Sequence, residues 1–184
     1  MANEALLKPK TAIIIADATD WAGDQYGWGA RTDQIDLTSI ATTAARQSAK
    51  VNLAVSGTFL ATIYAVYMAI EMDVAAVAGT TVDLYAGFSA SATAATGNPA
   101  GLTGADAAYA GVVSLATSLP QLEHIGAMVM TASIATTPQL QFIGYFVAPE
   151  QYACFVVVNN TAQAFEGDAV QMAIRVVPYV REVQ

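Results

Sequence analysis

The chain has 184 residues, enough for one compact domain that buries a substantial core without disulfides or metals. Charged residues make up 12% of it, against roughly 25% in an average soluble domain, and 55% is hydrophobic. So little charge leaves weakly polar surface facing water, which predicts a homo-oligomer or a larger assembly; an Ala-, Thr- and Gly-rich monomer is the alternative. The net charge of −8 and the scattered basic residues argue against a nucleic-acid partner.

Residues 1–10 are predicted to form an N-terminal arm, and residues 11–184 a single domain. The first residues lack the basic flank and apolar centre of a signal peptide, so we expect a protein made and used without secretion. Lys8 and Lys10 flank a proline and could contact an acidic partner, although solvated tail residues are the simpler interpretation.

Residues 11–15 are rich in isoleucine and predict a first strand, which a glycine-rich loop follows over residues 16–34. Three aromatic residues of this loop, Trp21, Tyr26 and Trp28, could stack on a sugar or enter a partner's pocket. Equally, they could fold back over the end of the domain. These three residues are the best binding candidates in the sequence.

The densest acidic group lies in and just after the same loop and consists of Asp17, Asp20, Asp24, Asp33 and Asp36. Oxygen ligands on such a loop could bind Ca²⁺, but their spacing is not that of an EF-hand. Aspartates that form turns are the expected role, with calcium binding as the alternative.

The middle of the chain predicts further strands. Residues 50–55 alternate between apolar and polar side chains. Residues 58–72 fit a buried strand because β-branched and aromatic residues dominate, although the spacing also fits a helical stripe. A membrane helix is disfavoured, since the run is short and lacks basic anchors. The strand at 80–88 is expected to form a hairpin with 58–72.

Residues 89–111 are a long run of Ala, Ser, Thr and Gly with no periodicity that would bury a face, which predicts a surface excursion. Strands are then expected over residues 119–131, 139–147, 155–161 and 169–178. Seven or eight strands with turn signals between them predict an all-β fold, a β-sandwich or jelly roll with long loops.

Reactive chemistry is sparse in this sequence. His124 is the only histidine, so a catalytic triad or a histidine metal site would depend on it, and a surface position is expected instead. Cys154 is the only cysteine, lies in an apolar run and is expected to be buried and inert. No nucleotide-binding loop or zinc spacing is present. We therefore predict a protein without enzymatic activity, cofactor or metal.

From about residue 82 onward the chain resembles small structural proteins of tailed-bacteriophage particles. The resemblance is carried by Val82–Tyr85, Gly97–Pro99, Gly104–Tyr109, Leu140–Gly144, Val156–Thr161 and Asp168–Val170. It implies a capsid cement or decoration protein with a jelly-roll fold, made in the bacterial cytoplasm and located in the virion. The implied partners are the major capsid protein or other virion proteins, together with further copies of the chain, a trimer being favoured at three-fold positions.

Two other functions remain open. A tail or head-fibre component of the particle belongs to the same structural class. A carbohydrate-binding module would belong to a different class and would use the aromatic loop.

Overall fold

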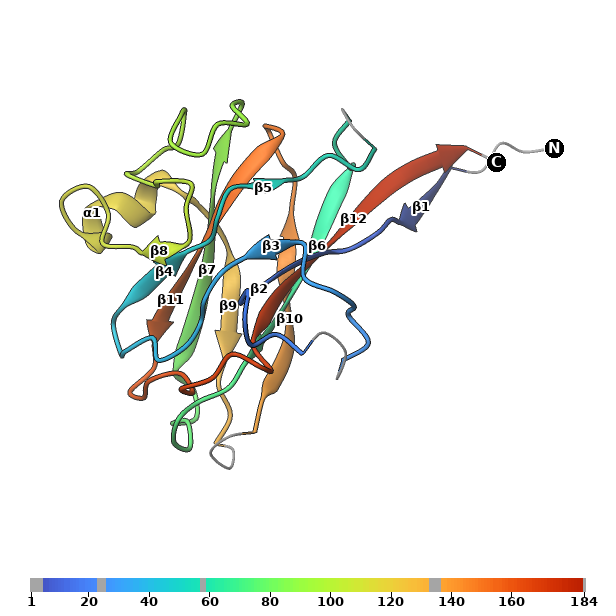
Figure 1. Ribbon diagram of the computed structural model, residues 1–184. Coiled ribbons are helices and arrows are strands. Elements are labelled where there is room, and N and C mark those ends of the chain that lie inside the picture. Colours follow the sequence, from blue (N-terminus) through green and yellow to red (C-terminus); the bar gives the residue numbers. More distant parts are fainter. Residues whose placement is uncertain (1–4, 23–25, 57–58, 133–136, 184) are drawn as a thin grey trace.

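A computed structural model describes residues 5–22, 26–56, 59–132 and 137–183 (Figure 1). The predicted all-β fold is confirmed, because two six-stranded sheets pack together and the described part of the chain has only short helical turns. In chain order the elements are β1 (Ala5–Pro9), β2 (Ile13–Ala16), β3 (Asp33–Gln34), β4 (Ala45–Gln47), β5 (Val51–Asn52), β6 (Ile63–Ile70), β7 (Thr81–Ser89), β8 (Ala107–Ala108), α1 (Leu115–Ser118), the 3₁₀ turn η1 (Leu119–Gln121), β9 (Glu123–Val129), β10 (Gln139–Phe146), β11 (Tyr152–Asn160) and β12 (Ala173–Val183).

The strands are connected as a jelly roll. Sheet A has the order β10-β6-β12-β2-β3, with β1 added beside β12, and sheet B has the order β8-β4-β11-β7-β9, with β5 added beside β11. The strand pairs are nested along the sequence, each pair lying between the two members of the next wider pair. From the widest to the narrowest, β2 pairs with β12, β4 with β11, β6 with β10 and β7 with β9. A long hairpin rolled up on itself gives this nested pairing, with two sheets of four main strands.

The expected hairpin between residues 58–72 and 80–88 is wrong. Strand β6 lies in sheet A and β7 in sheet B, and the intervening residues carry the chain from one sheet to the other. The two strands meet face to face across the core, because Val66 and Met68 of β6 belong to the same buried cluster as Leu84 of β7. These two consecutive strands thus pack against each other across the core and share no backbone ladder.

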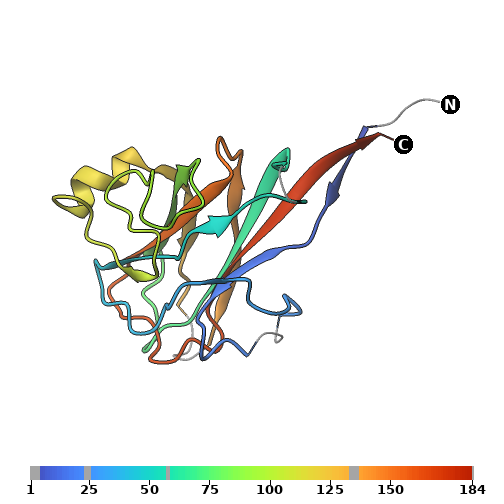
Figure 2. The ribbon, with the colours of Figure 1, turned by 45° about the horizontal axis from the view of Figure 1, so that its top comes forward.

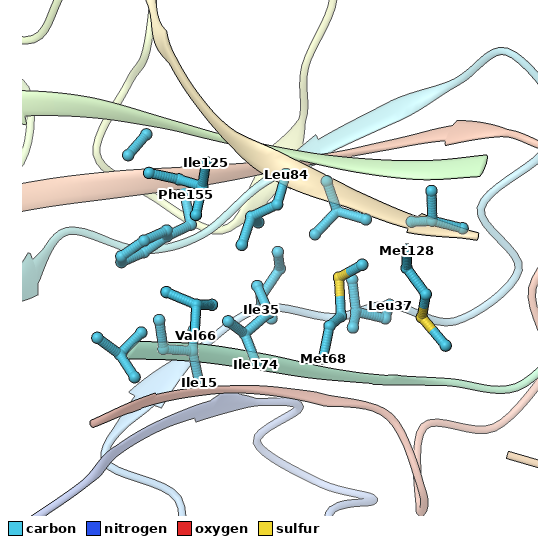
Figure 3. Close-up of a cluster of buried hydrophobic side chains, with 14 of the residues drawn as sticks. Ile15, Ile35, Leu37, Val66, Met68, Leu84, Ile125, Met128, Phe155 and Ile174 are labelled. Carbon is cyan, nitrogen blue, oxygen red and sulfur yellow. The ribbon is translucent and has the colours of Figure 1, made fainter. Parts of the chain in front are cut away.

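The core fills the space between the sheets. Ile15, Val66 and Ile174 project from sheet A towards Leu84 and Phe155 of sheet B (Figure 3). All five side chains are fully buried. Side chains alternate between the two faces of a strand, so these five lie on the inner faces of their sheets.

The excursion around residues 89–111 covers the outer face of sheet B. Contrary to the sequence-based expectation, it buries an apolar set, since Leu102 and Tyr109 pack with Cys154 and Val156 of β11. A Cβ added at Gly87 would lie 2.3 Å from Leu102 Cδ1, so a larger residue there would displace the Leu102 side chain of the excursion. The outer layer of sheet B is therefore supplied by the chain itself.

Strand β12 continues beyond its neighbours and forms a two-stranded ribbon with β1. Its pairing with β6 ends at Tyr179 and Ile63, whereas its pairing with β1 continues to Val183 and Ala5. Figures 1 and 2 show this ribbon projecting from the body of the sandwich. The described part of the predicted arm is therefore a paired strand, and residues 1–4 lie outside the described residues.

Candidate functional site

The outer face of sheet A is apolar. Cross-strand partners point to the same side of a sheet, so Tyr67 of β6 shares this face with Phe142 of β10 and Arg175 of β12. Arg175 is the one charged residue among the outward positions of these three strands within the sandwich. Antiparallel sheets with one solvated face normally carry polar residues on it, so an apolar outer face indicates that something covers it.

The loop after β2 covers one half of this face. Trp28 is only 9% exposed and packs with Ile14, Ala69 and Ala173. Its ring centroid lies 5.1 Å from that of Tyr26 and 6.3 Å from that of Trp21. The aromatic loop is thus a lid over the strands beneath it.

Polar atoms of these rings bond to backbone carbonyls, one within the loop and one outside it. The Tyr26 hydroxyl donates to the Gln171 carbonyl at 3.2 Å, and Trp21 Nε1 donates to the Gly29 carbonyl at 3.2 Å. Burial, reinforced by the charge of Glu71, raises the pKa of Tyr26 to about 12. The sequence left open whether these rings bind a ligand or fold back; their packing favours folding back, with Trp21 and Tyr26 still partly exposed.

The other half of the face is open. Leu140, Phe142 and Tyr145 of β10 are all exposed, and the Phe142 and Tyr145 ring centroids are 4.7 Å apart. Next to them lies a hollow of about 260 Å³ at the base of the ribbon. It is lined by Leu7, Ile63, Tyr145 and Tyr179. We call Leu7, Ile63, Leu140, Phe142, Tyr145 and Tyr179 the open face.

The charged side chains on one face of the ribbon form ion pairs with one another. Lys8 Nζ lies 3.0 Å from Glu182 Oε2, and Lys10 pairs with the other oxygen of the same carboxylate. Lys10 and Lys8 hold the pKa of Glu182 below its usual value. The two lysines named as candidate partner contacts are therefore engaged within the ribbon. The opposite face of the ribbon carries Arg181, which is paired in register with Leu7 of the open face.

The acidic group named as a possible calcium site is dispersed. Asp17 Oδ1 accepts from the backbone N–H of Thr19 at 2.7 Å and of Asp20 at 2.9 Å, which is a turn-forming role. Asp36 Oδ2 instead lies 3.5 Å from an Arg46 nitrogen. Among the described residues no group of three or more acidic, histidine or cysteine side chains is placed to hold a metal ion, and Asp24 lies outside those residues.

A second acidic group was not recognised from the sequence, because its members come from two distant segments. An isolated bridge between Met72 and Phe165 brings Glu71 beside Glu166, while Asp73 follows on the other side of the bridge, where its N–H donates to the Ala164 carbonyl at 3.1 Å. The Glu166 N–H donates to the Glu71 carbonyl at 3.0 Å. Glu71 is buried and its Oε2 has no hydrogen-bond partner among the described residues. Burial, then the charges of Asp168 and Glu166, raise the pKa of Glu71. We call Glu71, Asp73, Glu166 and Asp168 the acidic end.

The remaining candidates do not form a reaction centre. His124 is exposed on β9, with its ring centroid 4.9 Å from that of Tyr85. Cys154 is buried as predicted, and burial raises its pKa to about 11, so the thiol stays protonated and unreactive at neutral pH. Within the described residues, no helix is both long and apolar enough to cross a bilayer.

Comparison with known proteins gives no matching family model, no matching curated protein and no matching solved structure.

Proposed function

We propose that this protein is a non-enzymatic structural subunit of a tailed-bacteriophage particle, a capsid cement or decoration protein that binds the major capsid protein and stabilises the head shell. Within the same structural class, a tail or head-fibre location is the alternative. The observation that carries the proposal is the open face, an uncovered apolar surface that continues onto a projecting ribbon.

Several features support an assembly role. The jelly roll hosts many functions and by itself decides none of them. This example, however, covers the outer face of one sheet with its own excursion and leaves half of the other uncovered. Exposed apolar surface of this kind is typical of protein–protein interfaces, and the resemblance to phage structural proteins names the assembly.

The proposed action is mechanical. Each subunit removes apolar surface from water when the β10 part of its open face, around Leu140 and Phe142, contacts the shell, at about 25 cal/mol per Å² buried. A shell presents many equivalent sites, so subunits linked to one another bind with the combined strength of several contacts. The bound layer then opposes separation of the shell proteins beneath it.

Substitution of one open-face ring tests the proposal. Phe142→Ser removes an exposed aromatic side chain, and loss of its burial, about 2 kcal/mol, should weaken binding to purified particles about thirtyfold in a co-sedimentation titration. Val113→Ser is the matched control, because Val113 is 85% exposed and lies just after the excursion, away from the open face. Equal binding by both variants would contradict the proposed contact surface.

Immunogold electron microscopy of particles locates the subunit. Label over the head supports a cement or decoration role, whereas label at one vertex or on the tail supports the alternative. Absence of the protein from both labelled particles and their denaturing gels would overturn a role in the virion.

A further inference from the structure

The two ends of strand β12 differ in charge. The acidic end, Glu71, Asp73, Glu166 and Asp168, lies beside its start, since Ala69 of β6 is paired with Ala173. Its other end carries Arg181 and pairs with the strand that holds Lys8. Ten residue steps separate the ends of β12, which is about 34 Å of extended strand. The molecule is therefore electrostatically polar along sheet A.

Charge is unbalanced at both ends. Residues 5–10 and 179–183 contain three basic residues and one acidic residue, a net +2, so the remainder of the −8 chain carries −10. Counting Glu4 with the ribbon leaves it at +1 and the remainder at −9. None of the four carboxylates of the acidic end forms an ion pair with a described residue, because the ion pairs within the described ranges involve Lys8, Lys10 and Arg46.

Arg181 is the unpaired cation at the base of the ribbon. It is exposed and forms no ion pair with any described residue, and its backbone N–H donates to Thr62 Oγ1 at 3.3 Å. Its register partner Leu7 is 55% exposed and lines the hollow with Tyr179. Arg181 is thus the cross-strand neighbour of Leu7, one of the four residues that line this apolar hollow.

The opposite end carries the complementary features. Directly after Asp73 the chain turns back towards β7 and exposes Val74 and Val77, at 44% and 49%. An apolar projection flanked by carboxylates is what a hollow flanked by a guanidinium can accommodate. Both surfaces belong to the same chain, so a second copy could supply the projection that the hollow accommodates.

We propose that copies of this chain associate head to tail, with the turn at residues 73–77 of one copy seated in the Leu7–Tyr179 hollow of the next and Asp73 facing Arg181. The two surfaces in contact are different, so every docked copy leaves one surface free for another neighbour. Such heterologous contacts close into a ring or continue as an open chain. A ring of three corresponds to the trimer expected from the sequence.

This inference deepens the proposed function and rests on it only in that an assembly subunit contacts its neighbours. It is tested on the purified full chain without particles, so its outcome is independent of particle binding. Phe142→Ser and particle co-sedimentation test the proposed function separately.

The test is a charge exchange measured by sedimentation velocity over a concentration series. Arg181→Glu and Asp73→Arg should each raise the dissociation constant of self-association about tenfold or more, because each places like charges opposite one another. The double variant should return to within about threefold of the parent, since the charges are again opposite. Arg31→Glu and Glu123→Arg are matched controls at exposed positions outside both surfaces and should leave association unchanged.

Leu7→Asp tests the apolar part of the contact and should also weaken association, whereas Val113→Asp should not. Thermal melting of each variant shows that it is folded. A parent that stays monomeric at all concentrations would overturn the proposal. So would single variants that associate like the parent, or a double variant weaker than both singles.

Discussion

Arg175 lies on the outer face of sheet A, where it contacts the aromatic loop. Its guanidinium carbon lies 5.9 Å from the ring centroid of Trp28 and 5.7 Å from that of Tyr67. A guanidinium between two aromatic rings gains cation–π attraction, which partly offsets the removal of its charge from water. Its Nε is buried without a hydrogen-bond partner among the described residues. The aromatic loop therefore stabilises a half-buried cation as well as covering apolar strands.

Trp28→Ala is accordingly expected to destabilise the fold. Removing a buried tryptophan leaves a cavity and uncovers Arg175, and the free energy of unfolding should fall by about 3 kcal/mol. Urea denaturation followed by tyrosine fluorescence measures the change. Trp21→Ala, at a half-buried position of the same cluster, should have a smaller effect. A Trp28→Ala protein as stable as the parent would show that the ring serves recognition instead.

Glu71 makes stability depend on pH. Because its pKa is raised in the folded state, the fold binds this proton more tightly than the unfolded chain, and stability falls as pH rises from the ordinary value near 4.5 through the folded pKa. Glu71→Gln removes the buried charge and should raise the melting temperature at neutral pH.

The gain from Glu71→Gln should vanish below the ordinary carboxyl pKa, where Glu71 is neutral in both states. Calorimetry at several pH values gives the comparison, with Glu123→Gln as an exposed control. A gain that is the same at all pH values would contradict burial of the charge as its cause.

At the scale of elements, the two sheets meet at a corner between β9 and β10. A Cβ on Gly126 of β9 would lie 2.5 Å from the Ile143 carbonyl oxygen of β10. The Gln141 side chain accepts from the Val129 N–H at 3.1 Å and donates back to the Val129 carbonyl at 2.6 Å. A side-chain amide thus takes the place of a neighbouring strand, which satisfies backbone groups that an edge strand would otherwise expose.

Removal of residues 1–9 should abolish the ribbon without disrupting the rest of the fold. Strand β1 pairs only with β12, and Lys10 N–H still donates to the Pro178 carbonyl at 2.8 Å. The shortened protein should keep its circular dichroism spectrum and most of its thermal stability, because sheet A loses only the edge strand β1 and sheet B stays complete. It should lose self-association and particle binding, since the hollow loses Leu7. Undiminished particle binding would rule out the arm as a contact.

At the scale of the whole molecule, local patterns predicted strands but could not predict their partners. The apolar runs at 80–88 and 139–147 correspond closely to β7 and β10. The hairpin assigned to 58–72 was wrong because nested pairing joins β6 to β10, which no adjacent signal encodes. The acidic end was missed for the same reason, since Glu71 and Asp168 meet only in the fold. The sequence singled out Trp21, Tyr26 and Trp28 as binding candidates. Their burial could not be predicted, because it depends on the apolar outer face of sheet A, which forms only in the fold.

Nested pairing also determines which truncations the fold can tolerate. The last described strand, β12, lies between β6 and β2 at the centre of its sheet, and β11 lies between β4 and β7 in the other. A nascent chain therefore cannot complete either sheet until residues 152–183 have been translated. A truncation that removes residues 152–183 would delete the middle of both sheets, whereas loss of residues 5–9 would delete only the projecting edge strand β1. Truncation should accordingly be tolerated at β1 but not at β11 or β12.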